Sequence, residues 1–370
     1  MKGFKVKLHP TKEQEKMFHM NFGASRFAYN WALEKQKSHY DNGGKFIYDA
    51  ELRRMFTQFK KEEGNEWLYD VINNTTKQAI KDLCKSYKAF FKGVSKHPKF
   101  KSKRKSKNSF YHDTVKIKFT GTHVKLEKIG FVKLAEKDRI PTDCKYFNPR
   151  ITFDGINYWI SLTCDVDENQ VLTQEKTSPI GIDLGLKTLA VCSNGEILKK
   201  VNITKEQKRL KRLQKRASKQ YDLIKKKKIN SKSNRLKKLE KKILKQHQRI
   251  TNLLDNNIHQ FTSKIVNLNP SHIVLEDLNV TGMMKNKHLS EKIAKAKFYE
   301  LRRQFEYKSE RKGIKLIFAD RWYPSSKLCS CCGHKKEKLS LSERLYVCDE
   351  CGIEIDRDFN ASLNLQKLAM

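Results

Sequence analysis

The sequence predicts a multi-domain protein with α+β and α/β parts. A small N-terminal β-barrel with an inserted helical bundle is followed by an α/β domain that carries a short cysteine-rich insertion. Three observations predict this arrangement. Alternating strands lie on both sides of a helix-rich block, a later stretch runs strand, hairpin, helix, strand, and five of the nine cysteines fall within residues 329–351.

The first strand and the helical block are read from local patterns. "GFKVKLH" alternates Phe4, Val6 and Leu8 with lysines, which is typical of a half-buried strand. Thr11 and Gln14 match a capping box at the start of the helical segment, residues 11–94. Its aromatic residues are typical of a core, with base stacking as the alternative. We expect residues 1–10 and 95–175 to form the barrel around this insertion.

The second half of the chain has an α/β order. Strand patterns around Asp183 and Glu276 are separated by a long basic segment, and helix and strand patterns follow. We assign residues 176–328 and 352–370 to this domain, with residues 204–250 as a pair of basic helices. The cysteine-rich insertion takes residues 329–351.

The chain is strongly basic, with 78 Lys and Arg against 41 Asp and Glu and a formal net charge of +37. Such an excess favours a nucleic-acid partner over a merely solvated charged surface. Residues 95–107 hold seven Lys or Arg and no acid, and residues 204–250 hold 20 against three acids. We expect phosphate contacts from these two segments, specifically from Lys99, Lys101, Lys103, Arg104, Arg209, Arg212 and Arg216.

Four of the clustered cysteines have metal-ligand spacing. Cys329 and Cys332 form one Cys-x2-Cys pair, Cys348 and Cys351 form another, and 15 residues separate the pairs. This spacing predicts a zinc ribbon with one structural Zn²⁺ and no open coordination position. Cys331 is a spare that could compete with Cys329. The remaining cysteines are expected to be reduced thiols, in agreement with a cytoplasmic location, and no apolar run indicates export or a membrane span.

Three acidic residues lie in or against segments that otherwise belong to a core: Asp183 within a strand, Glu276 at a strand end and Asp358 at the start of a helix. A buried carboxylate is costly unless it is paired or binds a cation. Together they indicate ligands for two Mg²⁺ ions about 4 Å apart, which would hydrolyse a phosphodiester. The alternative is that each acid is a helix cap or an ion-pair partner, as we expect for Asp277 and Asp356.

The segments "GIDLGLKTLAV", "IVLEDLN" and "DRDFNASLNL" resemble the three acidic motifs of a RuvC-like, RNase H-fold nuclease. With a four-cysteine ribbon before the third motif, the chain resembles the TnpB family of insertion-sequence nucleases, relatives of the type V CRISPR effectors. "KVKLHPTKEQEKMF", "GASRFAYNWAL" and "YPSSKLCSCCG" extend the resemblance over essentially the whole chain.

The resemblance implies a wedge-type barrel, a helical recognition insertion and a RuvC-like domain containing the zinc ribbon. It implies an enzyme that binds an RNA made from the transposon end and cuts double-stranded DNA beside a short transposon-adjacent motif. The cofactor would be two Mg²⁺ ions, with Mn²⁺ as a substitute. The family's Asp-x-Asn motif selects Asp358 over Asp356. One protein would act on one RNA, in the prokaryotic cytoplasm and at the nucleoid.

In the family, the helical insertion and the barrel read the DNA motif. On this chain that role maps to Tyr48, Asn73, Asn74, Lys77 and Gln78, each of which could equally be an ordinary surface residue. Two other functions compete with a guided nuclease. A DNA transposase would need a dedicated module such as a helix-turn-helix, which the sequence does not show, and a non-cleaving regulator would be expected to lack one of the acids.

Overall fold

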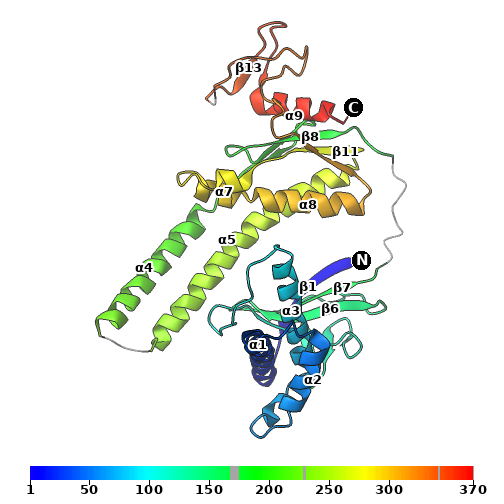
Figure 1. Ribbon diagram of the computed structural model, residues 1–370. Coiled ribbons are helices and arrows are strands. Elements are labelled where there is room, and N and C mark those ends of the chain that lie inside the picture. Colours follow the sequence, from blue (N-terminus) through cyan, green and yellow to red (C-terminus); the bar gives the residue numbers. More distant parts are fainter. Residues whose placement is uncertain (167–174, 228–230, 341, 370) are drawn as a thin grey trace. The chain divides into compact units, whose positions relative to one another are not determined.

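The computed structural model describes residues 1–166, 175–227, 231–340 and 342–369. The chain divides into two compact units, Met1–Asp167 and Glu168–Met370 (Figure 1). The predicted barrel boundary near residue 175 adjoins residues outside the described part. The middle of the predicted basic helices, at residues 228–230, and residue 370 also lie outside it.

A seven-stranded antiparallel sheet forms the first unit. Its strands follow the order β2-β6-β7-β1-β5-β4-β3. Their bounds are β1 (Lys2–His9), β2 (Asn108–Tyr111), β3 (Lys118–Phe119), β4 (His123–Leu126), β5 (Gly130–Leu134), β6 (Tyr146–Phe153) and β7 (Tyr158–Cys164). Strand β1 pairs with both β5 and β7, so chain segments on either side of the helical block share one sheet, as the alternation predicted. Closure of this sheet into a barrel stays a prediction.

The helical block contains α1 (Lys12–Asp41), α2 (Asp49–Phe59), the short 3-10 helix η1 (Glu66–Tyr69) and α3 (Asn73–Phe91). The predicted capping box is present: the Thr11 side chain accepts from the Gln14 amide, and the Gln14 side chain accepts from the Thr11 amide. Phe18 and Phe22 are buried in the core of the sheet. The core interpretation of these aromatics is therefore confirmed for the residues at the start of α1.

The second unit is built on a five-stranded sheet of order β10-β9-β8-β11-β12. Its strands are β8 (Ile180–Leu184), β9 (Ala190–Cys192), β10 (Ile197–Leu198), β11 (His272–Glu276) and β12 (Lys315–Ala319). Strands β8, β11 and β12 are parallel, with Ile182 beside Leu275 and Glu276 beside Ala319. Their carboxyl ends therefore lie along one edge of the sheet.

The helices of this unit are α4 (Thr204–Lys226), α5 (Asn234–Asn267), α6 (Val280–Met283), α7 (Ser290–Ala296), α8 (Phe298–Arg311) and α9 (Arg357–Lys367). Helices α4 and α5 are the predicted basic pair, but α5 continues to Asn267, beyond the predicted end at residue 250. It continues because Ile258, Phe261 and Ile265 join the hydrophobic core beside the sheet. Helices α7 and α8 are separate because Lys297 between them has a left-handed backbone, with φ +52°.

Between β12 and α9 lies a short hairpin, β13 (Leu345–Val347) paired antiparallel with β14 (Glu354–Asp356). It is the strand pair expected of a ribbon. Among the described residues, no helix has both the length and the apolar character needed to cross a membrane.

Candidate active site and metal centre

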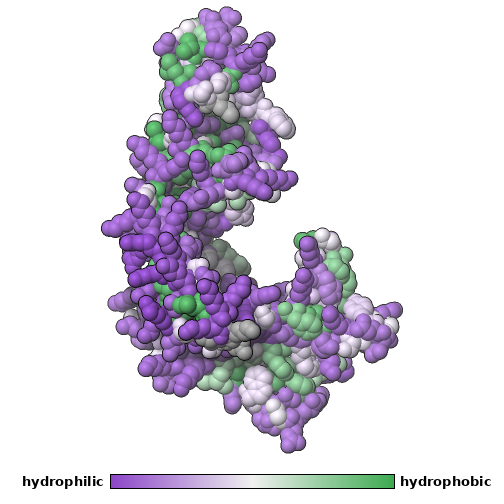
Figure 2. Space-filling model, turned by 90° about the vertical axis from the view of Figure 1, so that its left-hand side faces the viewer, coloured by the Kyte–Doolittle hydropathy of each residue, from purple (hydrophilic) through white to green (hydrophobic). Residues whose placement is uncertain are grey.

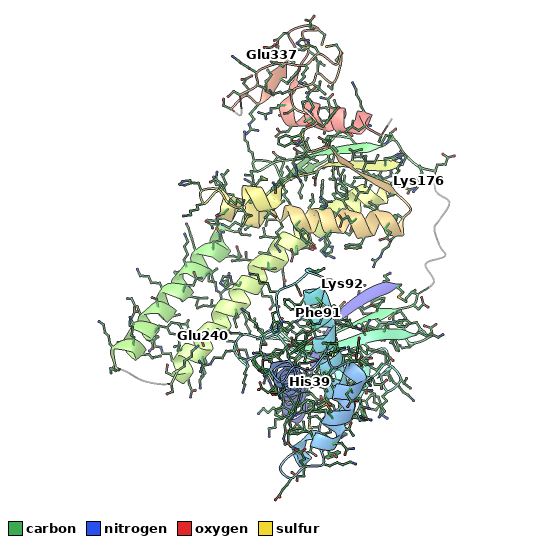
Figure 3. All side chains as sticks on the ribbon, viewed as in Figure 1. His39, Phe91, Lys92, Lys176, Glu240 and Glu337 are labelled. Atoms are coloured by element: carbon green, nitrogen blue, oxygen red, sulfur yellow. The ribbon has the colours of Figure 1, made fainter. Side chains whose placement is uncertain are left out.

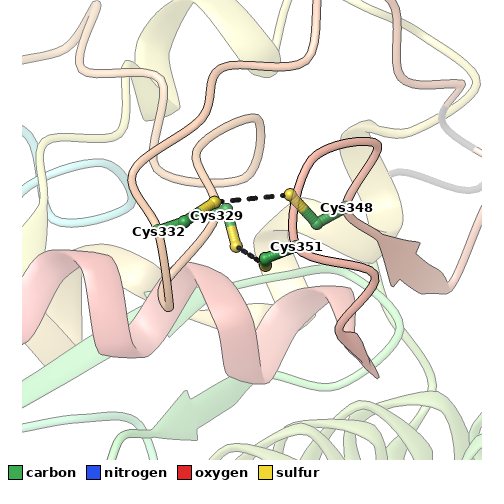
Figure 4. Close-up of side chains that lie close together, drawn as sticks. All are labelled: Cys329, Cys332, Cys348 and Cys351. Atoms are coloured by element: carbon green, nitrogen blue, oxygen red, sulfur yellow. Dashed lines mark hydrogen bonds between the residues drawn. The ribbon is translucent and has the colours of Figure 1, made fainter.

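The four predicted zinc ligands converge. The Sγ atoms of Cys329, Cys332, Cys348 and Cys351 all lie within 4.8 Å of one another (Figure 4). The Cys329–Cys351 sulfurs are 3.6 Å apart and the Cys332–Cys348 sulfurs 3.5 Å apart. A regular tetrahedron with metal–sulfur bonds of about 2.3 Å has sulfur–sulfur edges of about 3.8 Å. The donor set therefore fits one tetrahedral Zn²⁺.

The loops around the cysteines favour the thiolate form of the first cysteine in each pair, whereas the pKa of Cys332 and of Cys351 is raised, in part by hydrogen bonds with the neighbouring thiols. Gly333 and Gly352 follow the two pairs with φ of +78° and +67°, and the amide of each donates to the backbone carbonyl of the first cysteine of its pair. Burial acts to raise the pKa of Cys329, but backbone amides and neighbouring thiols lower it to about 7. The Cys351 amide lowers the pKa of Cys348 in the same way. Exposed Cys331 is not one of the four clustered thiols, although its amide donates to the Cys329 sulfur.

Two of the three predicted acids come from neighbouring parallel strands. Asp183 is the fourth residue of β8, and Glu276 is the last residue of β11. The Leu184 amide, next along the chain from Asp183, donates to the Glu276 carboxylate and lowers its pKa, although burial raises it by more. The two side chains thus lie at the same edge of the sheet.

The third acid reaches this edge from helix α9. Asp358 lies in the first turn of α9, where the positive end of the helix dipole favours an anion. Arg344 Nη1 is 3.7 Å from Asp358 Oδ1. Three carboxylates from segments far apart in the sequence therefore approach one another at one end of β8 and β11.

The electrostatics of Asp183 show that the three acids influence one another. Burial raises the pKa of Asp183 well above its ordinary value, and the charges of Glu276 and Asp358 raise it further, while Arg357 opposes them. A cation at this edge would remove the repulsion. The three carboxylates are not drawn into as tight a cluster as the cysteines.

Close packing at Gly181 fixes the position of α9. A Cβ at this residue would lie 2.1 Å from the Ser362 carbonyl oxygen and 2.4 Å from the Gln366 amide nitrogen. The helix backbone can approach β8 this closely because position 181 has no side chain. Since Asp358 is on the same helix, this contact sets the distance of the third carboxylate from the strand.

The acids set aside as structural have structural roles. Asp356 is the N-cap of α9, and its carboxylate accepts from the amides of Asp358 and Phe359 at 3.0 and 2.9 Å. Asp277 pairs with Arg302 and Arg321, both at 2.8 Å, and these partners lower its pKa. The expectation that these two acids act as a cap and an ion-pair partner is confirmed.

Helix α9 also connects the cysteine site to the sheet edge that carries Asp183, Glu276 and Asp358, called the acidic edge below. The buried Asn360 side chain donates to the Leu328 carbonyl at 2.7 Å and accepts from the Ser330 amide at 2.9 Å. One turn later, Asn364 donates to the carbonyls of Ser325 and Leu328. Cys329 therefore lies in a segment that is bonded directly to the helix carrying Asp358.

The basic helices present the charge predicted for them. Arg209, Arg212 and Arg216 are exposed on α4 and line a hollow of about 670 Å³ together with Lys242 of α5. Figure 2 views the molecule from the side on which α4 and α5 lie in Figure 1, and that surface is mostly hydrophilic. The acid Glu240, labelled in Figure 3, is bonded within the hairpin by Lys232 and Tyr221. The exposed arginines of α4 are therefore available to bind a polyanion.

The second basic segment is less uniform. Lys99, Lys103 and Arg104 are exposed, in agreement with a surface role. Lys101 is instead half-buried, its Nζ lies 3.6 Å from the centre of the Tyr29 ring, and desolvation lowers its pKa. The sequence does not distinguish Lys101 from its neighbours, because the ring that covers it belongs to a distant helix.

Four of the predicted motif readers lie in one region, the start of α3, and three of these already have partners. The fifth, Tyr48, packs instead on Phe46, whose ring contacts Tyr87 and Phe91 at the other end of α3. Tyr48 is 65% exposed, and Asn73, Asn74, Lys77 and Gln78 lie in the first turns of α3. Asn73 accepts from Lys60, Asn74 donates to Asp113 and Gln78 donates to Asp82. Base reading by these amides would require an exchange of partners.

Lys60 is a residue of this region that the sequence did not indicate. Its pKa is lowered by desolvation and by the charges of Lys77 and Lys128. At the acidic edge, Arg344 and Arg357 were missed in the same way. Their positions relative to the carboxylates depend on the hairpin fold, and only the adjacency of Arg357 and Asp358 in the sequence gave a signal.

Three protein-family models match parts of the chain. Residues 1–45 match a model described as "Helix-turn-helix domain", residues 161–287 one described as "Probable transposase", and residues 298–365 one described as "Cas12f1-like, TNB domain". Residues 1–45 contain β1 and the single helix α1, and the next helix begins only at Asp49.

Similar proteins extend over the whole chain. A protein of Streptomyces pristinaespiralis, provisionally named an RNA-guided DNA endonuclease, is 32% identical over 98% of this chain and 88% of its own. InsQ of Escherichia coli, with the same provisional name, is 28% identical over 99% and 91%. The Cas12f1 endodeoxyribonuclease of Sulfoacidibacillus thermotolerans is 29% identical over 32% of this chain and 28% of its own.

Solved structures are more distant. The chain of a Cas12f1–sgRNA–target DNA complex aligns with 14% identity over 100% of this chain and 99% of that one, at a TM-score of 0.34. A chain of a CRISPR–Cas12f ternary complex aligns with 14% identity over 96% of this chain and 82% of that one, at a TM-score of 0.35. Both TM-scores are below 0.5, so these alignments do not bear on the arrangement of this chain.

Proposed function

The chain belongs to the TnpB family of RNA-guided DNA endonucleases, and on that premise we propose that its acidic edge cuts the DNA that a bound RNA selects. One observation carries the proposal. Burial raises the pKa of Asp183 on β8, and the charges of Glu276 at the end of β11 and of Asp358 at the start of α9 raise it further, which supports a common site at one sheet edge. Such an edge is costly without cations and suits a phosphodiester hydrolase.

The fold assignment follows from the same elements. We assign the five-stranded sheet with α9 to a RuvC-like, RNase H-fold domain, with the zinc ribbon between β12 and α9. We assign the seven-stranded sheet to a wedge-type barrel into which the recognition helices α1 to α3 are inserted. The pairing of β1 with β5 and β7 supports the second assignment, since it makes the helices an insertion.

All three acids have the same role in the proposed reaction, and they would fill it from different elements. Two Mg²⁺ ions, or Mn²⁺ in their place, would supply an activated water and neutralise the leaving oxygen. Asp183 and Glu276 would hold them from the rigid sheet edge, and Asp358 would hold them from a helix start that is fixed by the Asp356 cap. Cleavage would leave 5′-phosphate and 3′-hydroxyl ends.

The basic surfaces would hold the nucleic acids. We propose that α4, α5 and residues 95–107 bind the backbone of a guide RNA made from the transposon end, and the backbone of the heteroduplex that this RNA forms with DNA. Tyr48 and the first turns of α3 would read the short DNA motif beside the target. One protein would act on one RNA, in a reducing cytoplasm where the cysteines stay available to zinc.

The first experiment is to express the chain beside its native flanking DNA and to sequence the RNA that co-purifies with it. A discrete RNA that ends in sequence from beyond the element supplies a target for a cleavage assay. A smear of cellular RNA, with no guide-dependent cutting, would contradict guiding. Joined DNA ends in place of free 3′-hydroxyls would favour the transposase named by the match over residues 161–287.

A matched pair of variants tests the catalytic assignment. Asp358→Asn should abolish cutting, because a metal ligand is lost. Asp356→Asn should cut nearly as well as the wild type, because asparagine caps a helix about as well as aspartate does. The reverse result would assign the third metal ligand to Asp356.

A further inference from the structure

Trp322 is unusual among the four tryptophans of the chain. Its side chain is 85% exposed, whereas Trp67 is 36% exposed and Trp31 and Trp159 are half-buried. An indole buries a large apolar area when it packs, so full exposure of one forgoes that stabilisation. The exposure of Trp322 does not stabilise the fold, which indicates that the side chain contributes to binding.

The turn that carries Trp322 is held on both sides. The Trp322 amide donates to Asp320 Oδ1 at 2.8 Å, and Arg321 Nη2 donates to Asp277 Oδ2 at 2.8 Å. On the other side, Tyr323 packs against the buried cluster of Val274, Ala319 and Leu365, and its hydroxyl donates to the Asn364 carbonyl at 3.3 Å. The indole is therefore presented by a fixed backbone, which lowers the entropy lost when a ligand binds it.

Trp322 also lies at the edge that carries the acids. Strands β11 and β12 are parallel with Glu276 beside Ala319, so the turn after β12 leaves the sheet where β11 ends in Glu276. Arg321, next to Trp322, contacts Asp277, next to Glu276. Strands are about 4.8 Å apart, so β12 is about 10 Å from β8, roughly three nucleotides of a stacked strand at about 3.4 Å each.

We propose that Trp322 is a stacking platform for a base of the unpaired DNA strand that enters the acidic edge, which rests on the function proposed above. A ring can stack on a base that is out of its duplex, and every base offers such a face. Arg321 and Arg302 beside the turn remain 46% and 41% exposed while they pair with Asp277. Arg302 also pairs with Glu306, so the charges beside the turn balance. The position of the indole at the proposed nuclease edge is what favours a DNA base as its ligand.

The test uses the full chain with its guide RNA in an Asp183→Asn background, so that the DNA stays intact. Target strands carry the fluorescent base 2-aminopurine at successive positions on either side of the cut site. Stacking on Trp322 should quench one position or two adjacent ones. Trp322→Ala should abolish that quenching and Trp322→Phe should retain most of it. Quenching that is unchanged in Trp322→Ala, or found only on labelled guide RNA, would overturn the proposal.

Cleavage in the Asp183-containing enzyme gives a second readout. Trp322→Ala should cut about 5- to 150-fold more slowly, with unchanged melting temperature and RNA binding. Leu268→Ala is the matched control, because Leu268 is 41% exposed and precedes β11 at the opposite end of the strand. Wild-type rates from Trp322→Ala would refute the platform. No guided cutting by the wild type would instead refute the proposed function, and quenching of 2-aminopurine in free single-stranded DNA, lost in Trp322→Ala, would then decide the stacking.

Discussion

The cysteine site and the acidic edge are assembled in opposite ways. Four cysteines come from two turns within residues 329–351, while the acids come from positions 183, 276 and 358. Backbone amides lower the pKa of one thiol in each cysteine pair, whereas burial raises the pKa of Asp183 and Glu276. The first site is prepared for its ion by local turns. The second is held together by the global fold, against the repulsion of its own charges.

Asp183→Asn gives the largest expected effect and tests the cost of the acidic edge. Cleavage should fall by at least about a thousandfold, because several kcal/mol of metal-held charge stabilisation are lost. In metal-free buffer at neutral pH, the melting temperature should rise, because a desolvated charge is removed. Cleavage assays and calorimetry with a chelator check both effects, and a lower melting temperature would contradict the account of the edge.

The same variant predicts a pH dependence. The folded pKa of Asp183 lies above the unfolded value of about 3.9, so its contribution to stability is fully present below about pH 4. That contribution is lost as the pH rises through the raised pKa. The stability advantage of Asp183→Asn in metal-free buffer should therefore grow from about pH 4 upward. If the stabilities of the two proteins change with pH in parallel, the pKa of Asp183 is not raised by folding.

Cys348→Ser tests the locally prepared site and should have the next largest effect. The zinc content should fall from one ion to none, and the ribbon should lose its fold because its stability comes from the metal. Cutting should fall about 10- to 100-fold, since Cys329 and α9 are bonded through the 325–330 segment. Cys331→Ser is the control and should keep its zinc. Retention of zinc by Cys348→Ser would refute the four-ligand assignment.

Gly181→Ala has the smallest expected effect and tests how the global fold places the third acid. A methyl group cannot fit 2.1 Å from the Ser362 carbonyl, so α9 must shift or the strand must bend. We expect a loss of about 1–3 kcal/mol, with a melting temperature about 2–4 °C lower per kcal/mol. Gly23→Ala, where nothing lies within 4 Å, is the control. Equal stability of Gly181→Ala and the wild type would show that α9 is not clamped there.

The contrast also explains what the sequence could predict. The four clustered cysteines could be predicted because ligand spacing and glycine turns lie within one short stretch. The hairpin was predicted only in part, since its second strand, β14, lies beyond the predicted end of the ribbon at residue 351. The three acids could be picked out from the sequence only because burying a carboxylate is energetically unfavourable. A carboxylate inside an apolar strand, such as Asp183, therefore indicates a partner or a bound cation even when its neighbours in space are unknown. Asp356 and Asp358, two residues apart, could not be separated on that basis, and the family resemblance and the observed cap distinguish them.

What depends on distant partners was not predictable. Lys101 looked like its exposed neighbours until the Tyr29 ring was found beside it. Asn74 and Gln78 looked free, yet they bond Asp113 and Asp82 from other parts of the first unit. The end of α5 at Asn267 was missed because a helix that leaves its basic stretch and enters a core changes composition without a break.

The bonds from Asn360 and Asn364 to the cysteine-bearing segment also have a consequence for how the enzyme is made. Synthesis proceeds from the N-terminus, so Asp358 leaves the ribosome after all four cysteines, and α9 can dock only once its anchoring segment is in place. A nascent chain therefore carries two of the three carboxylates and no completed site. Assembly order alone would keep the unfinished nuclease inert beside the nucleic acids of the cell.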